Sequence, residues 1–165
     1  MNKNYINHYY IIMNQNICIL LPTKFETKEI ENYLECNVKC EVFDDDFLNS
    51  FKCDEYEDDV FAHLKKEIFR TIEVTTKEKI IVIISDYMTA SLLENYKIFL
   101  YIPSKEYIET TITRRNDWCD ILNRINDIVY PFNRINYRYT FEYNSLNMLL
   151  KRITNDVISH INYII

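Results

Sequence analysis

Residues 17–29 read ICILLPTKFETKE, a short apolar run that passes through a proline-led loop into a charged segment. The run at 17–21 is rich in β-branched residues and has no polar side, which predicts a strand buried on both faces of a parallel sheet. Residues 80–84 and 97–102 have the same character. Strands of this kind need helices on both faces of the sheet, so the pattern predicts an α/β fold.

The segments between these runs predict the remaining elements. Residues 39–43 are expected to form a second strand, and polar and aromatic residues alternate over 135–141, which predicts a last, more exposed strand. Apolar residues at helical spacing predict helices near 30–34, 58–72, 104–115, 117–131 and 146–161, with Ser104 and either Asn144 or Ser145 as caps. The order β-α-β-α-β-β-α-α-β-α indicates a three-layer fold with a mostly parallel five-stranded sheet.

The length of 165 residues fits one domain over 16–165, preceded by an extension at 1–15 that lacks periodicity and is expected to be flexible or draped on the surface. The net charge of −6, with dispersed lysines and arginines, argues against a nucleic-acid surface. The longest apolar runs have about a quarter of the length that crosses a bilayer. We therefore expect neither nucleic acid nor membrane as a partner.

The number and spacing of the cysteines indicate whether the protein resides in a reducing or an oxidising compartment. The five cysteines form an odd set without a CxxC pair, and no histidine lies near them at zinc-ligand spacing. Reduced thiols are the simplest interpretation, which favours a cytoplasmic location over an oxidising one.

The chain contains no glycine, although average usage of about 7% would give on the order of a dozen. AT-rich coding accounts for most of this absence, but it matters in the loop after the first strand, where open α/β sheets bind ligands. Residues 22–29 match the phosphate-binding pattern GxxxxGK[ST] in length and position, with Lys28 on its lysine. Pro22 and Thr27 replace the two glycines, and Glu29 replaces the magnesium-binding hydroxyl.

These replacements have a physical cost. Proline has no N–H to donate, Phe25 adds bulk where an anion should approach, and glutamates at the start of the helix repel phosphate. The loop therefore predicts a phosphate cradle that has been lost, with Thr27 and Lys28 as its remnants. An ordinary connection with a surface lysine is the alternative.

Three further motifs follow in order: DDDFL at 44–48 after the second strand, KIFL at 97–100, and RRND at 114–117. Together with the loop they resemble the uridine kinase and phosphoribulokinase group of P-loop kinases, over about residues 16–162. Asp45 matches the family's catalytic aspartate, and the pair at 114–115 matches its lid arginines. The chain departs from the family where the third strand ends, with Ser85-Asp86 in place of Glu-Gly.

The resemblance implies transfer of the ATP γ-phosphoryl group to a nucleoside or similar hydroxyl, with Mg²⁺. Asp45 would orient or deprotonate the hydroxyl, Asp86 would hold Mg²⁺ through water, and Arg114 and Arg115 would neutralise the transferring group. Each has an alternative: residues 44–46 as a solvated acidic turn, Asp86 as a helix cap, and the arginines as partners of a helix dipole.

Three functions remain open. The first is a pseudoenzyme, a kinase-like binding module with weak or no ATP use that pairs with a protein partner or with itself. The second is an active, divergent kinase for a nucleoside or another small molecule, using ATP and Mg²⁺. The third is a small α/β protein unrelated to kinases.

Overall fold

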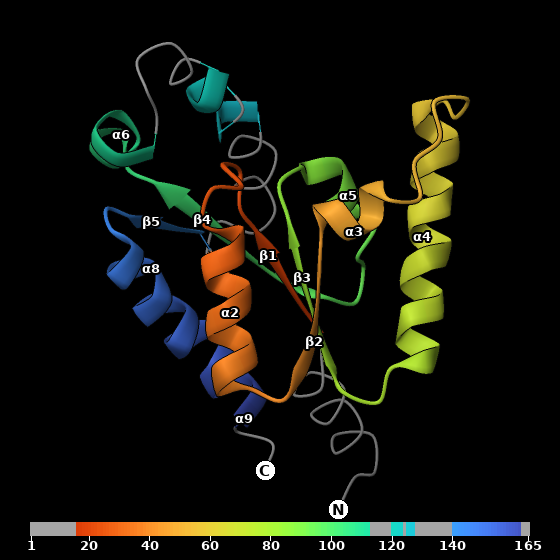
Figure 1. Ribbon diagram of the computed structural model, residues 1–165, viewed down its shortest axis with the longest axis horizontal. Helices are drawn as coiled ribbons and strands as arrows, with labels where there is room; N and C mark the ends of the chain where they lie inside the picture. Colours follow the sequence, from red (N-terminus) through yellow and green to blue (C-terminus); the bar gives the residue numbers. More distant parts are fainter. Residues whose placement is uncertain (1–15, 113–119, 124, 128–139, 163–165) are drawn as a thin grey trace, which may run out of the picture.

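A computed structural model of the protein describes residues 16–112, 120–123, 125–127 and 140–162. Its centre is a five-stranded sheet in the order β2-β3-β1-β4-β5 (Figure 1), in which every neighbouring pair is parallel. The strands are β1 (Ile17–Leu20), β2 (Cys40–Asp44), β3 (Lys79–Ile84), β4 (Lys97–Pro103) and β5 (Thr140–Tyr143). The first strand is central, with Cys18 opposite Val82 of β3 and Ile98 of β4. The predicted α/β class is confirmed, and the sheet is wholly parallel.

Two apolar layers explain why the central strands have no polar side. Successive side chains point to opposite faces, so Ile17 and Ile19 enter one core cluster while Cys18 and Leu20 enter the other. All four are fully buried. A strand covered on both faces must be apolar at every position, and this is the pattern that the sequence carries.

The helices divide between the two faces (Figure 1). One face is covered by α2 (Thr27–Asn37), α8 (Leu146–Ile153), the π-helical turn η3 (Thr154–Ile158) and α9 (Ser159–Asn162). The other is covered by α3 (Asp45–Asn49), α4 (Asp58–Thr75) and α5 (Tyr87–Ser91). After β4, α6 (Lys105–Tyr107) continues into the π-helical turn η1 (Ile108–Ile112), and Ile108 packs with Ile121 and Ile125 of the helical residues 120–123 and 125–127.

Two short helices, α3 and α5, were not predicted. Each has five residues and begins after an aspartate whose carboxylate caps it: Asp44 accepts the Phe47 N–H at 2.9 Å, and Asp86 accepts the Thr89 N–H at 2.9 Å. The acidic turn expected at 44–46 is thus a cap followed by a helix. The caps predicted at Ser104 and Ser145 are confirmed. The extension at 1–15 and most of the predicted 135–141 strand lie outside the described residues.

A parallel sheet collects the carboxyl ends of all its strands at one edge. The loop after β1, the start of α3, the start of α5 and the cap of α8 therefore share this edge. Within the described residues, no helix combines the length and the apolar character needed to cross a bilayer.

Candidate functional site

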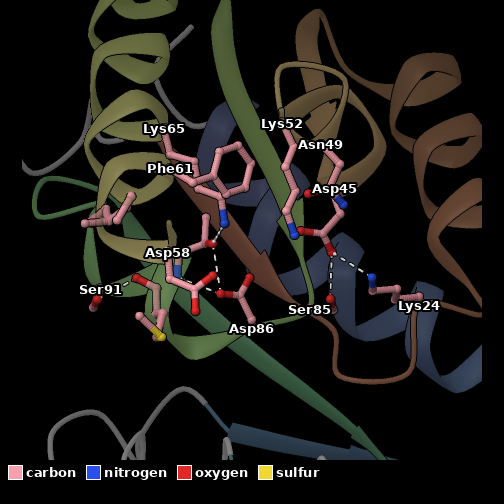
Figure 2. Close-up of a pocket in the computed structure, with 14 residues that line it drawn as sticks. Lys24, Asp45, Asn49, Lys52, Asp58, Phe61, Lys65, Ser85, Asp86 and Ser91 are labelled. Atoms are coloured by element: carbon pink, nitrogen blue, oxygen red, sulfur yellow. Dashed lines mark hydrogen bonds and ion pairs between the residues drawn. The ribbon is translucent and has the colours of Figure 1, made fainter. Parts of the chain in front are cut away.

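A pocket of about 420 Å³ opens at the carboxyl edge, among α3, α4, α5 and the loop after β1 (Figure 2). This volume lies within the usual range of small-molecule sites, roughly 300–1,000 Å³. Three lysines and three aspartates contribute to its lining: Lys24, Lys52, Lys65, Asp45, Asp58 and Asp86. The opposed charges give the pocket both hydrogen-bond donors and acceptors.

Asp45, the first residue of α3, is held in the pocket by two partners. The Ser85 hydroxyl donates to its Oδ2 at 2.7 Å, and the Lys24 ammonium lies 3.9 Å from the same oxygen. Burial raises the pKa of Asp45, and the nearby Asp86 carboxylate adds to this effect, while Ser85 and Lys24 oppose it. The side chain is therefore a fixed acceptor at the pocket wall, in the position from which it could accept a proton from a ligand hydroxyl.

Asp86 occupies the same pocket as the cap of α5, so the helix-cap interpretation of this residue is confirmed. Its Oδ2 accepts both the N–H and the hydroxyl of Thr89, each at 2.9 Å. Lys65 in turn donates to the Thr89 hydroxyl at 2.8 Å. Among the residues that the structure describes, no group of three or more His, Cys, Asp or Glu side chains could hold a metal ion. Mg²⁺ binding at Asp86 stays a prediction.

The lysine that reaches the pocket from the first loop is Lys24, whereas the sequence pattern points to Lys28. Lys24 has a φ of 63°, a left-handed conformation that glycine adopts most easily. The side chain of Lys28 is 72% exposed, and its ammonium pairs with Glu31 at 3.2 Å and Asp44 at 3.7 Å. Neither Lys28 nor Thr27, the first residue of α2, lines the pocket.

The loop after β1 is folded on itself. The Lys24 N–H donates to the Leu21 carbonyl at 3.4 Å, and the Thr27 N–H donates to the Lys24 carbonyl at 3.2 Å. Two of the N–H groups that a phosphate cradle would aim at its ligand are therefore already paired. These two groups are not free to donate to the triphosphate that the family resemblance implies.

A buried carboxylate completes this closure. Glu26 is 4% exposed, and it accepts hydrogen bonds from the Thr23 hydroxyl at 3.0 Å and the Tyr143 hydroxyl at 2.9 Å. Burial raises the pKa of Glu26, and the two hydroxyls only partly oppose this effect. When ionised, this carboxylate adds negative charge at the point where a phosphate would meet the start of α2.

The remaining predicted residues, Arg114 and Arg115, lie outside the described residues. Sequence reasoning did not assign Lys24, Lys52 or Lys65 to the pocket, because lysines in loops and on helix surfaces carry no distinctive spacing. It counted Glu26 among the negative charges at the start of a helix and did not predict its burial, because its partner Tyr143 is 117 residues away.

No family model and no curated protein matches this chain. A crystal structure of an uncharacterized protein from Eubacterium ventriosum ATCC 27560 matches 91% of this chain and 99% of its own, with a TM-score of 0.56 and 10% identity. The crystal structure of APE1195 matches over 92% of this chain and 93% of its own, with a TM-score of 0.37 and 14% identity. The first of these shows a shared fold, and neither name states an activity.

Proposed function

We propose that this chain is a kinase-shaped binding module, a pseudoenzyme that holds a small hydroxylated molecule in the carboxyl-edge pocket and has lost the ATP phosphate site. The observation that carries the proposal is the closed loop after β1. Its N–H groups at Lys24 and Thr27 are bonded within the loop, and Glu26 is buried beside them. A phosphate would have to break these bonds and approach a carboxylate.

The position of the pocket supports the binding half of the proposal. The central strand β1 carries the loop at its carboxyl end, as the resemblance to the uridine kinase group requires. Asp45, which matches the family's catalytic aspartate in sequence, lines the pocket and is held there by Ser85 and Lys24. A carboxylate held in this way can accept a hydrogen bond from a ligand hydroxyl without any phosphoryl transfer.

Thermal unfolding with ATP and Mg²⁺ tests the loss of the phosphate site. A ligand at a hundredfold excess over its dissociation constant stabilises the folded state by about 2.7 kcal/mol. We expect no shift of the unfolding midpoint at millimolar ATP. Hydroxylated compounds should raise the midpoint clearly, and Asp45→Ala should abolish this shift. A shift with ATP would contradict the pseudoenzyme assignment.

One observation favours a second candidate, an active divergent kinase. Lys24 brings an ammonium group from the first loop to 3.9 Å from Asp45, so a lysine and the matched aspartate share the pocket even though Lys28 points elsewhere. If ATP does shift the unfolding midpoint, Lys24→Ala should abolish the shift and Lys28→Ala should leave it unchanged. The reverse result would return the site to Lys28 and to the original motif.

A further inference from the structure

We infer that the pocket recognises a small organic anion, a phosphate monoester or a carboxylate that also carries hydroxyl groups, through the ammonium groups of Lys52 and Lys65. The inference rests on the proposed function, because it assumes that the pocket binds a small molecule. It adds an acidic group to the nucleoside or similar hydroxyl compound that the family resemblance implies.

Two lysines meet at one aromatic ring on the α4 side of the pocket. The Lys65 ammonium lies 4.5 Å from the centre of the Phe61 ring, and the Lys52 ammonium lies 5.8 Å from the same centre. Figure 2 shows both side chains running beside this ring toward the pocket. They come from different elements, since Lys65 belongs to α4 and Lys52 to the segment between α3 and α4.

The two ammonium groups differ from Lys24 in their partners. Lys24 already has a carboxylate, Asp45, at 3.9 Å. Lys65 donates to a neutral hydroxyl, that of Thr89, and within the described part of the chain neither Lys52 nor Lys65 forms an ion pair. An acidic group on a ligand would supply the charge-assisted hydrogen bonds that these two donors lack.

The rest of the lining restricts how the ligand lies. Asp58 and Asp86 line the same pocket and would repel a second acidic group, so the ligand's single anion belongs beside the lysines. Phe61 is 7% exposed and offers an apolar wall for a carbon skeleton. Asp45, fixed by Ser85, is left to accept a ligand hydroxyl.

Matched pairs of probes test the inference by calorimetric titration and thermal shift. The pairs are glycerol against glycerol 3-phosphate and glycerate, and uridine against uridine 5′-monophosphate. We expect each anion to bind at least about tenfold more tightly than its neutral counterpart, a difference of about 1.4 kcal/mol. The comparison of glycerol 3-phosphate with glycerate distinguishes a phosphate from a carboxylate source, and a preference for either supports the inference.

Substitutions of single lysines test which side chains bind the anion. Lys52→Met and Lys65→Met should each weaken binding of the anion about fivefold or more and leave the neutral compound unchanged. Lys66→Met is the matched control, because Lys66 is the exposed neighbour on the same helix, and it should change neither. Lys52→Met keeps the hydrogen bond between Lys65 and Thr89, so it remains informative if Lys65→Met fails to fold.

Three outcomes would overturn the inference. Equal affinity for anion and neutral compound would do so and leave the proposed binding module standing. An equal loss on Lys66→Met would show that general charge, not this pocket, attracts the anion. If no probe of either kind binds, the inference and the proposed function fail together.

Discussion

The Tyr143 hydroxyl donates a hydrogen bond of 2.9 Å to the Glu26 carboxylate, and this bond joins the edge strand β5 to the loop that follows the central strand β1. The second oxygen of Glu26 accepts from Thr23 at 3.0 Å. Both donors are neutral hydroxyls, so the buried carboxylate receives hydrogen bonds from them but no opposite charge.

Glu26→Gln should therefore stabilise the protein at neutral pH. Burial raises the pKa of Glu26 in the folded state above its ordinary value of 4.5, so the wild type loses stability as the pH rises through that raised pKa. The gain of Glu26→Gln should be largest above the raised pKa and vanish below about pH 4.5. Urea unfolding across pH 4–8 measures it. Glu35→Gln, at an exposed position of α2, is the control. A variant less stable than wild type at pH 7 would show that the charged form is required.

The left-handed backbone at Lys24 should reverse the usual order of alanine and glycine. A non-glycine residue in this conformation costs roughly 1–2 kcal/mol, which exceeds the extra chain entropy of glycine. Lys24→Gly should then be more stable than Lys24→Ala by about 1 kcal/mol. At Lys28, inside α2, glycine should be less stable than alanine by about 1 kcal/mol. The same order of stability at both positions would contradict the conformation at Lys24.

Asp86 allows capping to be separated from ion binding. Asp86→Ala removes the acceptor of both Thr89 hydrogen bonds and should destabilise the protein by about 1 kcal/mol. Asp86→Asn keeps an oxygen acceptor and should be close to wild type in chemical denaturation. Ligand affinity measured on Asp86→Asn then reports the charge alone. A large stability loss in Asp86→Asn would show that the carboxylate does more than cap α5.

Thiol labelling should follow burial. Cys36 and Cys53 are exposed, whereas Cys18 lies in the core beneath the pocket. Burial, helped by Asp45 and Asp86, raises the pKa of Cys18 far above its usual range, and burial raises the pKa of Cys40 to about 11. Iodoacetamide labelling followed by peptide mass mapping should modify Cys36 and Cys53 first, Cys40 slowly, and Cys18 only at the rate of unfolding. Labelling of Cys18 as fast as Cys36 would contradict the core assignment.

The sequence predicted β1, β3 and β4 well because each is a run of mostly apolar, buried residues. The first four strands were expected at 17–21, 39–43, 80–84 and 97–102, and each lies within about one residue of its observed bounds at either end. Helices α3 and α5 were missed because five residues are too few for an apolar stripe to repeat. Their only local signal is the aspartate that caps each.

The candidate site was harder to predict because its geometry depends on contacts that spacing does not encode. Asp45 was predicted from its match to the family motif and Asp86 because it follows a buried strand. Both line the pocket, since the carboxyl ends of parallel strands meet at one edge. Lys28 was predicted on motif length alone. The lysine that lines the pocket is Lys24, whose backbone is left-handed, and no glycine in the loop marks that conformation in the sequence. Glu26 becomes a buried group only when β5 supplies Tyr143.

The hydrogen bond between Glu26 and Tyr143 also affects the order in which parts of the protein reach their native form during synthesis. Its two ends are separated by 117 residues, so the carboxylate in the loop after β1 can be enclosed only after those residues have left the ribosome. Until then Glu26 is hydrated and charged. The loop after β1 is thus synthesised well before it can reach its native form.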